Sequence, residues 1–130
     1  QPQLKKCVIE MGGKNAIIVD SDADLDEAVP AIMQSAFGFQ GQKCSAASRV
    51  IVVGRAYEPL LARLGEMVQE LSVGPADDPQ HQVNAVIDLP AFEKINRYIS
   101  LGKKEVRLVA QAPVPEGGFF VPPTVFADVP

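Results

Sequence analysis

Two short runs of apolar, mostly β-branched residues stand out in the first part of the chain: NAIIVD at 15–20 and RVIVVG at 49–54. Uninterrupted runs of this kind are typical of strands that are buried on both faces, as in parallel sheets. Between the two runs, apolar residues recur at helical spacing from Leu25 to Phe37. A strand, a helix and a second strand in this order predict a β-α-β unit with a parallel crossover.

The start of the helix predicted over 25–37 carries its own signals. Asp24 followed by Glu27 has the spacing of a capping box, with Asp in place of the usual Ser or Thr. Pro30 falls inside the helix, where it removes a backbone hydrogen bond and favours a kink. We therefore expect a helix that is irregular near its first turns.

The rest of the chain continues the same alternation. A second amphipathic helix is predicted over 57–71, and Gly74-Pro75 ends it. A third is predicted over 89–101, with Asp88 as its cap and Pro90 in its first turn. Further strands are predicted at 106–110 and at 119–126, the latter broken by Pro122-Pro123. The predicted fold class is α/β, a parallel sheet with flanking helices.

The composition is that of an ordinary globular protein. The chain has 130 residues, 47% of them hydrophobic and 22% charged, enough for one domain with a modest core. The net charge of −4, with both signs interspersed, gives no reason to expect nucleic acid or an anionic membrane as a partner. No apolar run approaches the roughly 20 residues of a membrane span. The chain begins Gln1-Pro2-Gln3, with neither an initiator methionine nor a signal segment, so we expect a piece of a longer protein.

The few cysteine and histidine residues limit which disulfides, catalytic pairs and metal sites this chain can form. Cys7 and Cys44 are the two cysteines, too few for the disulfide framework of a secreted domain, although they could pair in principle. A reducing, intracellular compartment is the better expectation. His81 lies in the polar stretch ADDPQHQ and is expected to be a solvated loop residue without a partner. A histidine-activated cysteine hydrolase is therefore disfavoured, and no set of residues is singled out as a metal site.

Two segments have the composition of a reactive site. They are EMGGKN at 10–15 and FGFQGQKCSA at 37–46. Glu10 and Cys44 each lie five residues before a predicted strand. If those strands are parallel neighbours about 4.8 Å apart, both residues emerge side by side at the same edge of the sheet. That edge is the amino-terminal side of the strands, so a site there needs another domain to cover it.

A cysteine beside a carboxylate permits nucleophilic chemistry. A free thiol has a pKa near ~8.5 and attacks as the thiolate, which the neighbouring Lys43 would favour if its side chain points the same way. Glycine lets backbone N–H groups approach an oxyanion, and Glu10 could act as a general base. The alternatives are that Cys44 is an inert small apolar residue and Glu10 a solvated acid. A phosphate-binding loop is excluded, because Val8 and Asn15 stand where that motif needs Gly and Ser or Thr.

Together these segments resemble the NAD(P)-dependent aldehyde dehydrogenases. EMGGKN is similar to the family's glutamate signature, E-[LM]-G-G-K, and FGFQGQKCSA to its cysteine signature, F-x-x-x-G-Q-x-C, at the family's interval. SDADLDEAV, FEKINRYISLGKKE and GGFFVPPTVFADVP also resemble the family's catalytic domain, so the likeness spans the chain. MGGKNAIIVD with FGFQGQKCSA is most similar to the 1-pyrroline-5-carboxylate dehydrogenase branch, which oxidises L-glutamate γ-semialdehyde to L-glutamate in proline catabolism.

The resemblance implies roles for individual residues. Cys44 would attack the aldehyde carbon, and its backbone N–H would help to hold the oxyanion. Oxidation of the thiohemiacetal would leave a thioester, and Glu10 would activate the water that hydrolyses it. Met11 and Gly12 would lie along the nicotinamide end of the cofactor, which is NAD, with NADP as the alternative. Ser45 would hydrogen-bond the substrate's α-carboxylate, and Lys43 is assigned with it to substrate binding.

The resemblance also implies what lies outside this chain. The family's oxyanion asparagine and Rossmann cofactor domain precede the glutamate signature. A cofactor-ribose glutamate and part of the substrate loop follow the segment that ends at Pro130. We therefore expect residues 1–130 to be a segment of the catalytic domain that is inactive by itself. The full-length enzyme would be a cytoplasmic homo-oligomer, or lie in the mitochondrial matrix if the organism is a eukaryote.

Other interpretations remain open. The chain could belong to another branch of the family, such as the succinate-semialdehyde or broad-substrate enzymes, or be an inactive structural fragment. Asn84-Ala85 also departs from the G-P that the family usually has before V-[IV]-[DN]. This departure leaves the local turn undecided and is expected to touch no catalytic role.

Overall fold

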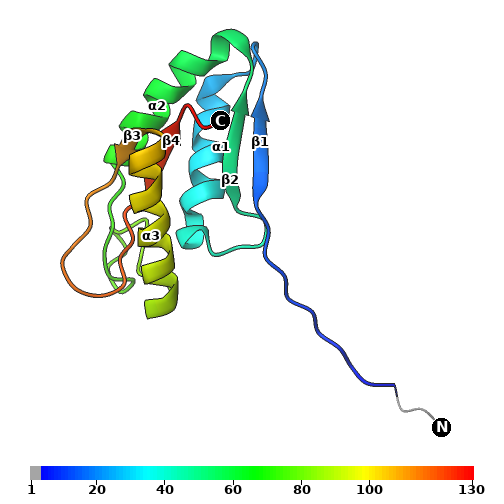
Figure 1. The fold of residues 1–130 in the computed structure, drawn as a ribbon, viewed down its shortest axis with the longest axis vertical. Coiled ribbons are helices and arrows are strands. Elements are labelled where there is room, and N and C mark those ends of the chain that lie inside the picture. Colours follow the sequence, from blue (N-terminus) through cyan, green and yellow to red (C-terminus); the bar gives the residue numbers. More distant parts are fainter. Residues whose placement is uncertain (1–3) are drawn as a thin grey trace.

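The structure is a computed structural model, and it describes residues 4–130. Its elements form two small sheets and three helices, which confirms the α/β class (Figure 1). β1 and β2 pair in parallel, and β3 and β4 pair antiparallel. In chain order the elements are β1 (Asn15–Val19), α1 (Leu25–Phe37), the 3-10 turn η1 (Gly38–Gly41), β2 (Ala47–Val52), the 3-10 turn η2 (Gly54–Ala56), α2 (Tyr57–Gln69), α3 (Leu89–Glu105), β3 (Arg107–Gln111) and β4 (Thr124–Ala127).

The β1–α1–β2 unit confirms the predicted parallel crossover. Ala16 pairs with Arg49, and the register then continues without a shift to Val19 and Val52. Asn15 pairs with Ala47, so the register shifts between Asn15 and Ala16 and leaves one extra residue in β2. β2 therefore begins two residues before the predicted start, because its pairing extends back past the apolar run.

Helix α1 has the predicted bounds, but its interior differs from the prediction. The Asp24 side chain caps the helix by accepting a hydrogen bond from the backbone N–H of Asp26 (2.9 Å), not from Glu27. The helix runs unbroken through Pro30, so the expected irregularity near its first turns is wrong. Proline there removes only the N–H that would bond to the carbonyl of Asp26, and its fixed φ is already helical.

The later elements shift their predicted boundaries by a few residues. α2 ends at Gln69, and α3 continues four residues past the predicted Leu101. The Asp88 side chain accepts a hydrogen bond from the backbone N–H of Ala91 (2.8 Å), which confirms it as the cap of α3. The predicted strand 119–126 is reduced to β4, because Pro122 and Pro123 have no N–H to donate to a sheet.

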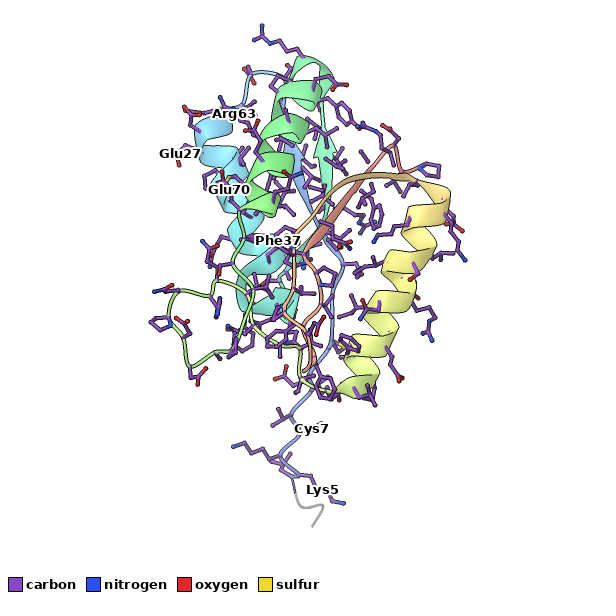
Figure 2. The ribbon with its side chains drawn as sticks, turned by 90° about the vertical axis from the view of Figure 1, so that its left-hand side faces the viewer. Lys5, Cys7, Glu27, Phe37, Arg63 and Glu70 are labelled. Carbon is purple, nitrogen blue, oxygen red and sulfur yellow. The ribbon has the colours of Figure 1, made fainter. Side chains whose placement is uncertain are left out.

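The core lies between the two strand pairs and helices α1 and α2, which pack beside each other (Figure 2). Leu60 and Val68 of α2 are fully buried there. The opposite face of β1 and β2 is uncovered, since Ile18 is 70% exposed and its partner Ile51 is 52% exposed. The prediction of strands buried on both faces therefore holds for one face only. None of the helices in the described part of the chain is long and apolar enough to cross a membrane.

A polar cluster after β4 ties together three separate elements. The Asp128 carboxylate accepts hydrogen bonds from Nε of Arg107 (2.6 Å) at the start of β3 and from the hydroxyl of Tyr57 (3.0 Å) at the start of α2. The Arg107 hydrogen bond, followed by that of Tyr57, holds the pKa of Asp128 below its usual range. Asp128 also has a left-handed backbone (φ 58°), a conformation that Asp and Asn tolerate better than most residues.

We predict that Asp128→Asn lowers the melting temperature at pH 7 by a few degrees at most, because ion pairs at exposed sites contribute little. Asn keeps the shape and the backbone preference but loses the charge. The folded-state pKa is depressed, so the stabilisation is present above the ordinary aspartate value of 3.8 and is lost as the pH falls through the lower folded-state pKa. Thermal unfolding at several pH values between 7 and 2 should show the two proteins converging in acid. A difference that stays constant with pH would contradict the electrostatic explanation.

Candidate active site

The start of β1 and the segment before β2 meet at one edge of the parallel sheet. Nδ2 of Asn15 donates a hydrogen bond to the backbone carbonyl of Cys44 (2.7 Å) and lies 3.5 Å from the carbonyl of Ala46. In return, the hydroxyl of Ser48 donates to the carbonyl of Asn15 (3.4 Å). The sequence spacing predicted this shared edge, and the structure confirms that the two segments meet there.

Gly13 brings its backbone against the same carbonyl. A Cβ atom at Gly13 would lie 2.5 Å from the carbonyl oxygen of Cys44, well inside van der Waals contact. Only glycine allows this approach without moving one of the two backbones. The second glycine of EMGGKN is therefore explained by packing against the Cys44 segment.

The turn that precedes Cys44 is strained. Phe39, Gln40 and Gly41 all have left-handed backbones, with φ of 56°, 57° and 67°. Such conformations cost free energy in residues other than glycine and are concentrated at functional sites. Two backbone hydrogen bonds close the turn on itself, from the N–H of Gln42 to the carbonyl of Phe39 (3.0 Å) and from that of Ala46 to the carbonyl of Lys43 (3.1 Å).

The segment 84–87 braces this turn from outside. The backbone N–H of Ile87 donates to Oε1 of Gln42 (3.0 Å). With its amide oriented by its partners, Gln40 accepts a hydrogen bond from the backbone N–H of Asn84 (2.8 Å). Nδ2 of Asn84 donates to the carbonyl of Gly74 (3.0 Å). The support that Asn84 gives to this turn was not predicted from the sequence. The signal for it in the sequence is that Asn84-Ala85 replaces the family's usual G-P.

Cys44 is a free thiol on the protein surface. Both Cys44 and Cys7 are exposed and unpaired, so the disulfide that could form in principle is not present. The Nζ of Lys43 donates to the carbonyl of Gln34 near the end of α1 (3.4 Å), so its ammonium points to the helix. Ser45 is exposed beside Cys44. The assignment of Lys43 and Ser45 to substrate binding remains a prediction.

Glu10, Met11 and Gly12 lie on the extended segment that precedes β1. This segment leaves the body of the molecule and carries Cys7 and Lys5 farther out (Figures 1 and 2). All three residues are exposed, and within residues 4–130 the Glu10 carboxylate has no hydrogen bond or ion pair. The structure thus places Gly13 and Asn15, not Glu10, in contact with the Cys44 segment. The predicted meeting of Glu10 and Cys44 remains a prediction.

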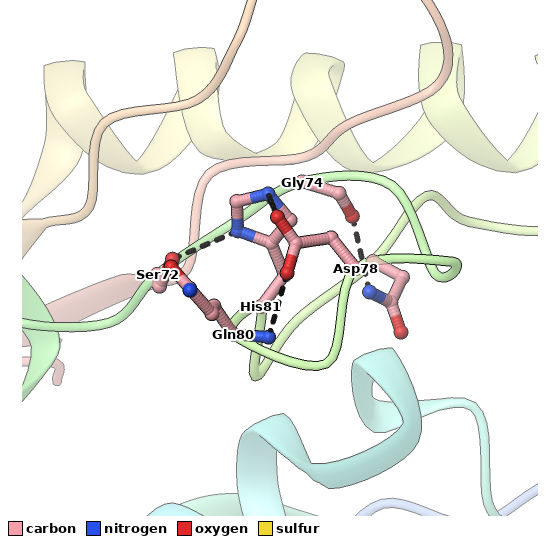
Figure 3. A network of polar contacts seen from close by, with 6 residues as sticks. Ser72, Gly74, Asp78, Gln80 and His81 are labelled. Carbon is pink, nitrogen blue, oxygen red and sulfur yellow. Dashed lines mark hydrogen bonds and ion pairs between the residues drawn. The ribbon is translucent and has the colours of Figure 1, made fainter.

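His81 is not the solvated residue that the sequence predicted. Its Nδ1 lies 2.8 Å from the hydroxyl of Ser72, its Nε2 lies 3.7 Å from Oδ2 of Asp78, and the ring packs on the backbone of Gly74 (Figure 3). The side chain is only 24% exposed. The prediction failed because Ser72 lies nine residues before His81 in the chain. A contact at that separation is not visible in the sequence around His81. The contacts close the loop between α2 and α3, and the 3.7 Å separation is too long for the hydrogen bond of a catalytic triad.

Cys44 lines neither of two apolar cavities, although both reach Phe37 and the first also reaches Gln40 in the turn before Cys44. One, of about 580 Å³, lies between α3 and the β3–β4 sheet. The other, of about 740 Å³, lies along β2, α2 and β4. In the part of the chain that the structure describes, no group of three or more His, Cys, Asp or Glu side chains could hold a metal ion. The reactive group at this edge of the sheet is the free, exposed thiol of Cys44.

Comparisons with known proteins identify relatives of the whole chain. The profile of the aldehyde dehydrogenase family matches residues 1–130. The 1-pyrroline-5-carboxylate dehydrogenase of Geobacillus sp. (strain WCH70) is 49% identical over 97% of this chain, and 1-pyrroline-5-carboxylate dehydrogenase 2 of Halalkalibacterium halodurans is 45% identical over 99%. In each case this chain spans 25% of the relative's length.

Solved structures agree with these relatives. Proline utilization A from Bdellovibrio bacteriovorus, inactivated by N-propargylglycine, superposes with a TM-score of 0.94 at 50% identity, covering 100% of this chain and 14% of that one. The 1-pyrroline-5-carboxylate dehydrogenase from Thermus with bound NAD superposes with a TM-score of 0.86 at 48% identity, covering 93% of this chain and 23% of that one. This chain thus has the same fold as one part of each of these larger proteins.

The strained turn generates a stability prediction. Gly41→Ala should lower the free energy of unfolding by about 1–2 kcal/mol, because a left-handed backbone disfavours any Cβ and this one would lie 2.8 Å from the carbonyl of Ala36. Gly12→Ala is the matched control, since no atom lies within 4 Å of its added Cβ, and it should change stability by less than about 0.5 kcal/mol. Urea unfolding measures both. Equal effects of the two substitutions would show that the turn is not strained.

Proposed function

This chain belongs to the aldehyde dehydrogenase family, and we propose that it forms the catalytic segment of an NAD-dependent enzyme that oxidises L-glutamate γ-semialdehyde to L-glutamate. The observation that carries the proposal is the free, exposed Cys44, held on a strained and braced turn against Gly13. The choice of substrate is supported by the relatives at 45–49% identity that are 1-pyrroline-5-carboxylate dehydrogenases. Because the chain spans a quarter of their length, the activity is proposed for the full-length protein.

Cys44 is the proposed nucleophile. Its thiolate attacks the aldehyde carbon, and the aldehyde oxygen takes the negative charge. Within residues 4–130 the backbone N–H of Cys44 has no hydrogen-bond partner, so it is free to donate to that oxygen. The product of this step is a thiohemiacetal on Sγ.

Met11 and Gly12 are the proposed contacts for the nicotinamide end of the cofactor. Met11 is 75% exposed, and there is open space beside the Cα of Gly12. These two residues would flank the nicotinamide of NAD. When bound, NAD supplies the acceptor for the two electrons removed from the substrate. The contribution of this chain is to hold the substrate carbon on Sγ of Cys44. Oxidation of that carbon converts the thiohemiacetal into a thioester.

Glu10 is the proposed general base for the second half of the reaction. It would take a proton from a water molecule as that water attacks the thioester carbon, and the bond to Sγ then breaks to release the carboxylic acid. The exposed carboxylate lies three residues before Gly13, which contacts the Cys44 carbonyl. This proximity along the chain supports the proposal that Glu10 acts next to the Cys44 thiol in the full-length enzyme.

Ser45 and Lys43 are the proposed contacts for the α-carboxylate of the substrate. They flank Cys44, and both are exposed. A hydroxyl and an ammonium are donors that suit a carboxylate. Lys43 would have to give up its hydrogen bond to the carbonyl of Gln34, which is long at 3.4 Å and therefore weak.

The two proposed half-reactions can be separated by substitution of Glu10. In the full-length enzyme, Glu10→Gln should keep a single burst of NADH while steady turnover falls by on the order of 10²–10⁴, the usual contribution of a positioned base. Gln has the same shape and cannot take the proton. Stopped-flow absorbance of NADH measures the burst and the turnover in one experiment.

Glu93→Gln is the matched control, because Glu93 is an exposed glutamate on α3. It should leave burst and turnover unchanged. If the burst of Glu10→Gln slows in parallel with turnover, Glu10 acts on the Cys44 thiol instead of on water. Normal burst and normal turnover in Glu10→Gln would remove Glu10 from the mechanism.

A further inference from the structure

We propose that Asn15 is a positioning residue for Cys44, and that its side-chain amide sets the orientation in which the thiol is presented. The inference rests on the proposed function, in which Cys44 is the nucleophile. Asn15 itself would touch neither substrate nor cofactor. It acts through one hydrogen bond, from its Nδ2 to the backbone carbonyl of Cys44 (2.7 Å).

Asn15 is well placed to act as a fixed anchor. Its backbone is the first residue of β1 and pairs with Ala47, so the Cα position is set by the sheet. Its own carbonyl also accepts a hydrogen bond from the hydroxyl of Ser48 (3.4 Å). The side chain then reaches beyond the end of the ladder to the Cys44 carbonyl, at the short end of the range for N–H···O bonds. The amide therefore transmits the rigidity of the sheet to the turn.

The Cys44 carbonyl is confined from two sides. The Asn15 amide holds it, and it lies so close to Gly13 that a Cβ atom added there would be 2.5 Å from the carbonyl oxygen. Because the peptide unit is planar, restraining this oxygen also restrains the Ser45 N–H and the Cα atom of Cys44, which lie in the same plane. The Cα atom from which the thiol side chain projects is thereby held near the end of the sheet.

The strain of the preceding turn explains why such an anchor is needed. Phe39 and Gln40 hold left-handed backbones that relax readily if the turn is released. The brace from Asn84 and Ile87 contacts Gln40 and Gln42, but it ends two residues before Cys44. The Asn15 hydrogen bond is made directly to the backbone carbonyl of Cys44, from outside the turn. A displacement of about 1 Å at a reacting group can cost on the order of 10²-fold in rate.

The test uses the full-length enzyme with Asn15→Ala, Asn15→Asp and a matched control, Asn96→Ala. Asn96 lies in α3, where its Nδ2 donates to the carbonyl of Phe92 (3.0 Å), so the control removes an equivalent hydrogen bond away from Cys44. Asn15 is exposed, so its replacement leaves no buried cavity. The readouts are the pH profile of the NADH burst, the KM for NAD, the melting temperature, and the alkylation rate of Cys44 relative to Cys7.

We expect Asn15→Ala to lower the plateau of the burst rate by about 10- to 100-fold, with the apparent pKa and the KM for NAD unchanged. Alkylation of Cys44 relative to Cys7 should change in the same variant. Asn15→Asp should lower the plateau and also raise the apparent pKa, because a carboxylate beside the turn disfavours the thiolate. Asn96→Ala should change the melting temperature only. A purely structural role of Asn15 would move the melting temperature and leave the plateau and the pKa unchanged.

The proposal is overturned if the Asn15→Ala burst stays within twofold of the wild type, or if Asn96→Ala causes an equal loss. Failure of the proposed function looks different, because Cys44→Ser would then keep the burst. If Cys44→Ser abolishes the burst while Asn15→Ala does not slow it, Cys44 is the nucleophile and only the role of Asn15 is wrong.

Discussion

The site depends on one constraint, the parallel pairing of β1 with β2 and the register shift at its start. Parallel pairing requires the chain to cross over through α1 and return at the same edge of the sheet. The extra residue in β2 then lets the Asn15 side chain reach the carbonyl of Cys44. This hydrogen bond ties the start of β1 to the turn that carries Cys44. With it, the thiol stands on a turn anchored to the sheet.

The energetic cost of that arrangement falls on the turn, and neighbouring segments offset it. Left-handed Phe39 and Gln40 are compensated by hydrogen bonds from the segment 84–87. This segment is in turn held by Asn84 against Gly74, in the loop that His81 closes. The loop between α2 and α3 therefore has a function in this account, because it supports the turn that carries Cys44. The strained turn before Cys44 is thus connected to the α2–α3 loop through a continuous set of hydrogen bonds.

The sequence predicted the features that depend on local pattern and spacing. Periodicity placed β1 and α1 correctly, and the equal distances of Glu10 and Cys44 from their strands identified the edge where two segments meet. Features that depend on tertiary partners were not predictable. The partners of His81 and the brace from Asn84 come from residues far along the chain, and no propensity signals three successive left-handed residues when two of them are not glycine. Pro30 was misjudged because one missing hydrogen bond does not interrupt a well-packed helix.

The central claim is that the thiol of Cys44 forms a covalent bond with the carbon being oxidised. Rapid acid quenching of the full-length protein during turnover with L-glutamate γ-semialdehyde and NAD, followed by peptide mass spectrometry, tests it directly. The account predicts a glutamyl thioester on the peptide that contains Cys44, none on the peptide that contains Cys7, and loss of the adduct when NAD is omitted. Turnover with no adduct on Cys44, together with undiminished activity of Cys44→Ser, would contradict it.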